Sequence, residues 1–108
     1  MKPAVKKAWV KALRSGKYRK GKEYLRRQEG KHDRYCCLGV LCDVNGVRWH
    51  RKWYDSLEYS VSGDCGNLTP RRLRQFGLTD VVQKALIKAN DERDWSFNRI
   101  ATWIEKNL

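Results

Sequence analysis

Four cysteines are the residues of this sequence best suited to chemistry. Cys36, Cys37 and Cys42 lie close together, Cys65 follows them, and His32 lies four residues before Cys36. Zinc prefers tetrahedral sets of thiolate and imidazole ligands, which chains usually supply as closely spaced cysteine pairs on tight turns. Two adjacent cysteines followed by a four-residue gap do not fit this pattern, and there is no second pair. We therefore expect buried free thiols that fill space among aliphatic side chains, with no metal and no other cofactor.

A catalytic cysteine is the second chemical possibility, because a reactive thiolate needs a nearby base and positive surroundings. The histidines are His32 and His50, and Cys36 follows a basic stretch. No nucleophile signature surrounds the cysteines, and phosphate-loop, dinucleotide-binding and zinc-protease motifs are absent. A group of acids lies near the end of the chain: Asp91, Glu92 and Asp94. They fall in an expected connection between helices, where they would cap a helix or face water. We therefore interpret the chain as a binding protein and not an enzyme.

Positive charge gives the strongest functional indication. The 108 residues carry 24 Lys and Arg against 12 Asp and Glu, a net charge of +12. Residues 1–34 hold 13 of the basic residues and three acids, a net charge of +10, which leaves +2 for residues 35–108. This excess of positive charge is larger than solubility requires. It predicts a polyanionic partner, and nucleic acid is the preferred candidate.

The candidate nucleic-acid contacts form two sets. The first, in the N-terminal third, consists of Lys6, Lys7, Lys11, Arg14, Lys17, Tyr18, Arg19, Lys20, Lys22, Arg26 and Arg27. The second, at the start of an expected helix, consists of Arg71, Arg72 and Arg74. Basic side chains bind phosphates with release of counterions, and a helix start favours anions. In the first set we expect Lys17, Arg19 and Lys20 to contact phosphate and Tyr18 to stack on an unpaired base.

Two other partners suit the same charge. An acidic host protein would associate faster through complementary charge, and a small anionic ligand such as a signalling nucleotide would fit a pocket of Arg and Trp side chains. Nucleic-acid binding predicts steep salt dependence on any long polyanion, whereas a host protein predicts one saturable partner. Ligand capture predicts thermal stabilisation by a nucleotide. The sequence leaves these three alternatives open, together with the oligomeric state.

Apolar spacing predicts a first helix from Pro3 to Arg14, ended by Gly16. Residues 17–22 form an expected loop, and residues 23–27 and 34–36 form an expected hairpin that turns at Gly30. The length of the apolar stretch 37–44 fits a buried strand or a buried helix, and a short buried helix is the preferred interpretation. Residues 47–62 are typical of short strands or of an irregular β-like segment, and residues 62–67 are typical of a turn.

Three further helices are expected, with Thr69, Thr79 and Ser96 as N-caps. The first ends at Gly77 and the second near Asn90. The buried face of the second is expected to hold Val81, Val82, Ala85, Leu86 and Ala89. That of the third is expected to hold Phe97, Ile100, Ala101, Ile104 and Leu108. The fold class is mainly α, or α+β: four to five short helices around one core with a small β-hairpin. We expect one domain over residues 1–108, in which the basic N-terminal helix and loop (1–34) pack on a helical core (35–108).

Three segments resemble one known group of proteins. The first runs from Trp9 through Ala12-Leu13-Arg14-Ser15-Gly16 to Gly21 and Leu25. The second is Tyr35-Cys36-Cys37-Leu38-Gly39-Val40-Leu41-Cys42-Asp43, and the third joins Asn90-Asp91, Ser96-Phe97, Ile100-Ala101 and Ile104-Glu105. This order resembles small proteins from tailed-bacteriophage and prophage genomes, from which the chain departs by its basicity and its segment 48–53.

The resemblance implies a phage origin, a bacterial cytoplasm as the place of action, and a role in host takeover or counter-defence. No apolar run is long enough to span a membrane, and the first residues are too charged for a signal peptide. We therefore expect no membrane partner.

Overall fold

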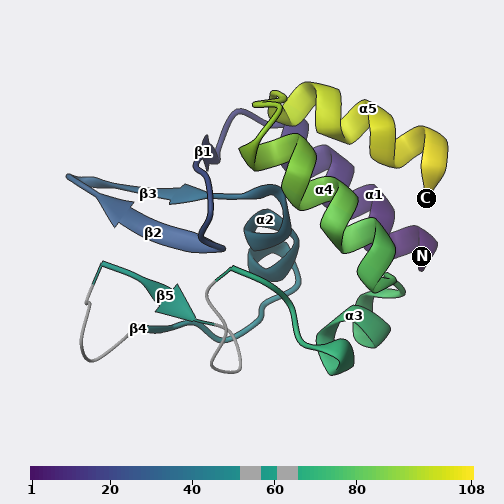
Figure 1. Cartoon of the computed structure of the whole chain (residues 1–108), viewed down its shortest axis with the longest axis horizontal. Helices are drawn as coiled ribbons and strands as arrows, with labels where there is room; N and C mark the ends of the chain where they lie inside the picture. The colour runs from purple at the N-terminus through teal and green to yellow at the C-terminus, as the bar shows by residue number, and fades with distance from the viewer. Residues whose placement is uncertain (52–56, 61–65) are drawn as a thin grey trace.

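Helix α1 (Pro3–Arg14) has the bounds that its apolar spacing predicts. Trp9, Val10 and Leu13 are buried on one side, and Gly16 follows the helix with a φ of +75°. The computed structural model describes residues 1–51, 57–60 and 66–108. Within these ranges the chain forms one globule of five helices, a three-stranded sheet and a two-stranded hairpin, which confirms the expected fold class (Figure 1).

The three-stranded sheet contains the expected hairpin, with strands at 26–29 and 32–35 where 23–27 and 34–36 were predicted, and one strand that was not expected. Strand β2 (Arg26–Glu29) pairs antiparallel with β3 (His32–Tyr35) around Gly30, whose φ is +61°. Strand β1 (Arg19–Lys20) pairs parallel with β3, so the order is β1-β3-β2. The prediction that residues 17–22 are only a loop was therefore wrong. A two-residue strand gains its pairing from a segment later in the chain, and no local pattern reveals it.

A second sheet consists of β4 (His50–Arg51) and β5 (Tyr59–Ser60), which pair antiparallel. This confirms the expected short strands in these two places. Parts of the expected strand segment 47–62 lie outside the described ranges, as do Cys65 and the first part of the expected turn at 62–67.

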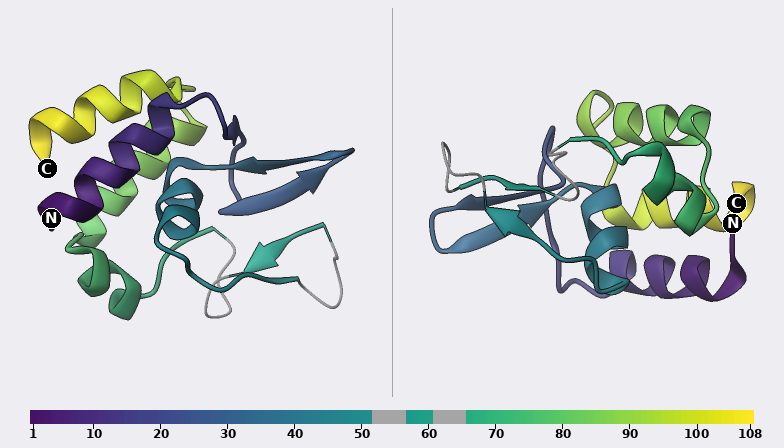
Figure 2. Two further views of the ribbon diagram at one scale, coloured as in Figure 1. Left: turned by 180° about the vertical axis from the view of Figure 1, so that it is seen from behind. Right: turned by 90° about the horizontal axis from the view of Figure 1, so that it is seen from below.

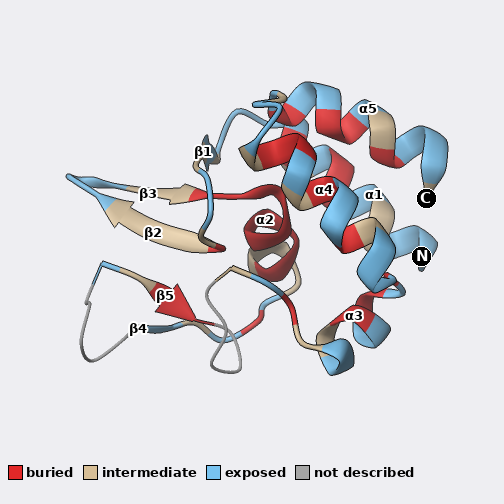
Figure 3. Cartoon of the chain, viewed as in Figure 1, coloured by how far each residue is buried: buried red, intermediate tan, exposed pale blue. Residues whose placement is uncertain are grey.

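Helix α2 (Cys37–Val44) lies at the centre of the core, as its composition predicts. Its residues from Cys37 to Cys42 are all buried (Figure 3). Gly39 allows the chain entering β2 to cross the helix at close range, because a Cβ atom at Gly39 would lie 1.7 Å from the carbonyl oxygen of Leu25. The same carbonyl accepts a hydrogen bond from the backbone N–H of Cys36 at 3.3 Å.

Three helices complete the fold: α3 (Pro70–Phe76), α4 (Asp80–Asp91) and α5 (Phe97–Asn107). The side-chain oxygens of Thr69, Thr79 and Ser96 each accept a backbone N–H of the first turn, as expected of N-caps. Gly77 ends α3 in the left-handed conformation, with a φ of +74°. The buried residues of α5 are Phe97, Ile100, Ala101 and Ile104, while the expected fifth member, Leu108, is only half-buried.

The predicted buried face of α4 was wrong by about one residue. Val81 is 78% exposed and Ala85 is exposed, whereas Gln83 and Asn90 are buried beside Leu86 and Ala89. The amide of Gln83 accepts the backbone N–H of Leu68 at 2.7 Å. That of Asn90 accepts the N–H of Cys37 at 3.2 Å and donates to the carbonyl of Gly21 at 2.9 Å. These hydrogen bonds offset the cost of burying two amides, so polar side chains direct the helix inward.

Helices α1 and α5 run side by side along one end of the molecule, with α4 on the other side of α5 (Figures 1 and 2). The two sheets lie at the opposite end, and α3 lies near the N-terminus, where Gly77 meets Met1. This arrangement leaves the outer surfaces of α1 and α5 in contact with solvent. Among the described residues, no helix has the length and hydrophobicity needed to cross a membrane.

Candidate functional site

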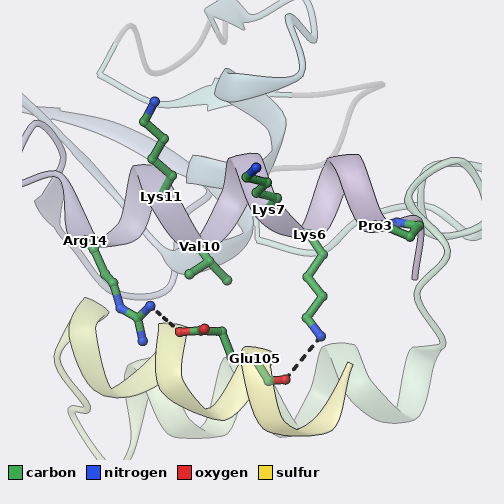
Figure 4. Close-up of a pocket in the computed structure, with 7 residues that line it drawn as sticks. All are labelled: Pro3, Lys6, Lys7, Val10, Lys11, Arg14 and Glu105. Atoms are coloured by element: carbon green, nitrogen blue, oxygen red, sulfur yellow. Dashed lines mark hydrogen bonds and ion pairs between the residues drawn. The ribbon is translucent and has the colours of Figure 1, made fainter.

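A basic groove of about 470 Å³ runs between α1 and α5. Four of the predicted contact residues line it: Lys6, Lys7, Lys11 and Arg14. Pro3 and Val10 contribute apolar surface to the same groove. Lys7, Lys11 and Arg14 follow one another at intervals of four and three residues. Lys6 is adjacent to Lys7 in the sequence and therefore lies about 100° further round the helix. Lys6 and Arg14 point toward α5, whereas Lys7 and Lys11 point away from it (Figure 4). All four cations that line the groove therefore come from α1, and two of them point toward α5.

Glu105 of α5 is the one acidic residue that lines this groove among the described residues. Its carboxylate forms an ion pair with Arg14, and its backbone carbonyl accepts a hydrogen bond from Lys6 Nζ at 3.1 Å (Figure 4). Arg14 Nη2 also donates to the hydroxyl of Thr102 at 3.2 Å. These contacts hold Lys6 and Arg14 at the side of the groove that faces α5. The carboxylate of Glu105 cannot neutralise all four cations that line the groove.

Four exposed cations on and just after α1 form no ion pair within the described ranges: Lys7, Lys11, Lys17 and Arg19. Lys11 borders the groove and also a second cavity, of about 270 Å³, that Lys17 and Tyr18 line. The two cavities thus meet at Lys11, and basic side chains follow one another along this side of the helix. We call the residues Lys6, Lys7, Lys11, Arg14 and Lys17 the α1 basic face.

Lys20 and Lys22 belong to a different structural unit. Lys20 Nζ donates to the carbonyl of Asn90 at 2.8 Å and to the carboxylate of Asp94 at 3.0 Å, and Lys22 Nζ lies 3.4 Å from the same carboxylate. The two lysines lower the pKa of Asp94, chiefly through the hydrogen bond from Lys20. Asp94 therefore fastens the β1 region to the end of α4. Asp94 is 66% exposed and so faces water, as expected, but its contacts with the two lysines were not predicted.

Arg26 and Arg27 are held within the sheets. Arg26 Nη2 lies 2.6 Å from the carboxylate of Asp33, and its guanidinium lies 4.0 Å from the centre of the Tyr59 ring. Arg27 Nη1 lies 3.2 Å from Glu58. Such contacts join the two sheets, and the charges of both side chains interact with groups of the protein itself. Arg26 and Arg27 are therefore not part of the α1 basic face.

Tyr18 is also engaged within the fold. Its hydroxyl donates to the carboxylate of Asp43 at 2.6 Å, and its ring meets that of Tyr35 edge to face with centroids 5.0 Å apart. Burial is the main cause that raises the pKa of Tyr18 above its ordinary value, and the hydrogen bond to Asp43 adds to it. Stacking of this half-buried ring on a base stays a prediction, and the contacts do not favour it.

The predicted cluster Arg71, Arg72 and Arg74 lies on α3, apart from the α1 basic face (Figure 1). Arg72 Nη1 donates to Gln75 at 2.8 Å, and Thr69 already accepts the backbone N–H of Arg72. Arg71 and Arg74 are exposed. The helix has seven residues, so its dipole is small and its capped first turn offers little to an anion.

The three described cysteines are buried free thiols, as expected: Cys36, Cys37 and Cys42. Burial raises the pKa of Cys36 to about 11 and that of Cys42 to about 12. It raises the pKa of Cys37 well above the ordinary value. A thiolate is the reactive form, so these side chains are poor nucleophiles. His32 and His50 are exposed, and no three Cys, His, Asp or Glu side chains gather as a metal site within the described ranges.

A further cavity, which the sequence analysis did not anticipate, lies on the outer side of α5. It measures about 270 Å³, and its lining is Trp95, Arg99, Thr102, Trp103, Lys106 and Asn107. These residues follow i, i+4, i+7, i+8, i+11 and i+12, a helical spacing that was available as a signal. The groove was missed because the buried apolar stripe from Phe97 to Ile104 was enough to predict the helix, and the residues on its other side were not considered as a site. We call this cavity the α5 tryptophan groove.

The comparisons with known proteins place the chain in a family. Residues 1–83 match the model of the family described as Domain of unknown function (DUF8296). The chain belongs to this family. The match includes the α1 basic face and ends within α4, so α5 lies beyond it. No curated protein and no solved structure matches the chain.

Proposed function

We propose that this protein binds nucleic acid through the α1 basic face. The observation that carries the proposal is the excess of cations over acids in the groove between α1 and α5. Arg14 pairs with the carboxylate of Glu105, the one acid that lines the groove among the described residues, and Lys6 donates to the backbone carbonyl of Glu105. Lys7, Lys11 and Lys17 keep their charge for a ligand. A phosphate backbone would contact these ammonium groups one after another and release its counterions.

The protein acts by binding and not by catalysis in this proposal. The buried thiols are protonated at neutral pH, and the exposed cations of α1 face solvent beside no described nucleophile. The resemblance to tailed-phage proteins leads us to propose a phage accessory role in the bacterial cytoplasm, in host takeover or counter-defence. An acidic host protein and an anionic nucleotide are the alternative ligands of the same face.

The experiment compares two variants that lose the same charge. Lys7→Ala/Lys11→Ala removes the two exposed cations of the groove that form no ion pair within the described ranges. Lys31→Ala/Lys88→Ala removes two exposed cations from the β2–β3 turn and from α4. Fluorescence anisotropy with labelled RNA, single-stranded DNA and duplex DNA at about 50 mM salt measures affinity, where each lost phosphate contact costs on the order of tenfold. We expect at least tenfold weaker binding for the first variant and nearly wild-type binding for the second.

Equal loss in the two variants would mean that net charge acts without a site, and it would overturn the α1 basic face as the interface. Absence of wild-type binding to all three probes would overturn nucleic acid as the ligand. In that event, a thermal shift with nucleotides and a pull-down from bacterial lysate would test the two alternative ligands.

A further inference from the structure

The α5 tryptophan groove differs from the surroundings of the other described tryptophans. The indole N–H of Trp9 donates to the carbonyl of Cys37 at 2.9 Å, and that of Trp49 donates to Asp43 at 3.0 Å. In the described part of the chain, the indole N–H groups of Trp95 and Trp103 have no such acceptor. Both rings are only half-buried and pack against the core from outside. Aromatic surface is therefore presented to solvent on a rigid support.

Cations accompany these rings. The guanidinium of Arg99 lies over the ring of Trp95, 4.2 Å from its centre, and Lys106 lines the same groove. None of the six described residues that line the groove is acidic. A cation held against an indole next to a second indole suits a ligand that carries both a flat ring and a negative charge. Nucleotides of a single strand have this chemistry, because their bases are unstacked.

The α5 tryptophan groove adjoins the α1 basic face. Thr102 lines the tryptophan groove, and its hydroxyl accepts the hydrogen bond from Arg14, which lines the basic groove. The two cavities therefore lie on either side of one hydrogen bond between α1 and α5. A strand whose phosphates follow the α1 basic face would need to cross only this contact for a base to reach Trp103.

We propose that the α5 tryptophan groove binds an unpaired base, so that the nucleic acid recognised by this protein is single-stranded. Trp103 provides the ring on which the base stacks, and Trp95 holds Arg99 in place for the adjoining phosphate. In a duplex the bases stack on one another, so this groove would contribute nothing to duplex binding. The inference rests on the proposed function, because the α1 basic face supplies the phosphate contacts.

The test uses two substitutions of Trp103 and one of Arg99. Trp103→Leu keeps apolar packing against the core and removes the aromatic ring, whereas Trp103→Phe keeps a ring. Arg99→Ala alters an exposed side chain and carries little risk to folding. Anisotropy measures the affinity of each variant for an oligothymidine strand, a single-stranded RNA and a duplex, and circular dichroism checks the fold. Stacking of one base on an aromatic side chain is worth roughly five- to 150-fold in affinity.

We expect Trp103→Leu to bind both single strands roughly tenfold more weakly and the duplex as wild type does, while Trp103→Phe keeps most of the affinity. Arg99→Ala should bind single strands a few-fold more weakly. Wild-type affinity of Trp103→Leu and Arg99→Ala for single strands would overturn the inference and leave the α1 basic face untouched. Tighter binding of the duplex than of the single strands would also overturn it. Absence of wild-type binding to any probe would overturn the proposed function itself.

Discussion

The guanidinium of Arg14 donates a hydrogen bond to the hydroxyl of Thr102 at 3.2 Å, across the interface of α1 and α5. This contact joins two surfaces of different character. On one side lie the lysines of α1, and on the other lie the tryptophans and basic residues of α5. The same guanidinium forms an ion pair with Glu105, so the only carboxylate lining the basic groove among the described residues is already occupied.

The segment after α1, which includes strand β1, contains cations with separate roles. Lys17→Ala/Arg19→Ala removes exposed charges that have no ion-pair partner within the described ranges, so we expect weaker nucleic-acid binding at an unchanged melting temperature. Lys20→Ala breaks the contacts to Asn90 and Asp94, so we expect a melting temperature lower by several degrees. Anisotropy and thermal unfolding of both variants measure the two effects. Weakened binding of Lys20→Ala with unchanged stability would contradict this division.

Gly39 is expected to tolerate no side chain. The Cβ atom of Gly39→Ala would lie 1.7 Å from the carbonyl oxygen of Leu25, so α2 or the adjoining chain must move. We expect a loss of about 3–5 kcal/mol in the free energy of unfolding, or no folded protein at all. Gly30→Ala is the matched control. Its Cβ meets nothing within 4 Å, and its φ of +61° should cost only about 1–2 kcal/mol.

Urea unfolding of these two glycine variants gives the comparison directly. Equal stabilities would show that the close approach of Leu25 to α2 does not constrain the fold.

The orientation of α4 can be tested by comparing the stability effects of substituting a buried polar residue and an exposed apolar residue. Gln83→Ala leaves the buried backbone N–H of Leu68 without its acceptor, so we expect a loss of about 2 kcal/mol in the free energy of unfolding. Val81→Ser alters a side chain that is 78% exposed, and we expect a change within about 0.5 kcal/mol. Chemical denaturation of the two variants measures both values. The reverse order would show that α4 presents its aliphatic stripe to the core.

The buried thiols make stability depend on alkaline pH. Burial raises the pKa of Cys42 from 9.0 to about 12, so unfolded chains lose this proton at a lower pH than folded ones. The contribution is fully present below pH 9 and declines as pH rises toward 12. For the same reason, the stability difference between wild type and Cys42→Ala should shrink by about 1.4 kcal/mol from pH 8 to about pH 10.

Thermal unfolding of the two proteins at these pH values tests the expectation, and the comparison cancels the titration of lysines and tyrosines. A difference that stays constant with pH would mean that the thiol of Cys42 is not held protonated by the fold.

Local patterns were sufficient to predict most of the helices. The bounds of α1 and α3 follow from apolar spacing and from caps such as Thr69 and Gly77, which act within a few residues. The apolar stretch that forms α2 did not by itself distinguish a buried helix from a buried strand. The orientation of α4 could not be predicted, because the partners of Gln83 and Asn90 are backbone groups far along the chain. Strand β1 was missed for the same reason.

The sequence was sufficient to predict which residue types form the candidate site, but not how their side chains are arranged in space. The sequence shows which residues are basic, yet the pairing of Lys20 with Asp94 spans 74 positions and removes Lys20 from the free cations. Conversely, Trp95, which precedes α5, and Trp103, which lies within it, follow helical spacing in the sequence. Only the packing of the inward stripe shows that both tryptophans remain at the edge of the core.

The salt dependence of binding is the measurement that tests the central claim most directly. Each phosphate contact contributes about 0.7 to the slope of log affinity against log salt for a single strand and about 0.9 for a duplex. Lys7→Ala/Lys11→Ala should therefore lower the wild-type slope for a single strand by about 1.4, whereas Lys31→Ala/Lys88→Ala should leave it unchanged. A slope that the first variant leaves intact would contradict the α1 basic face as the nucleic-acid interface.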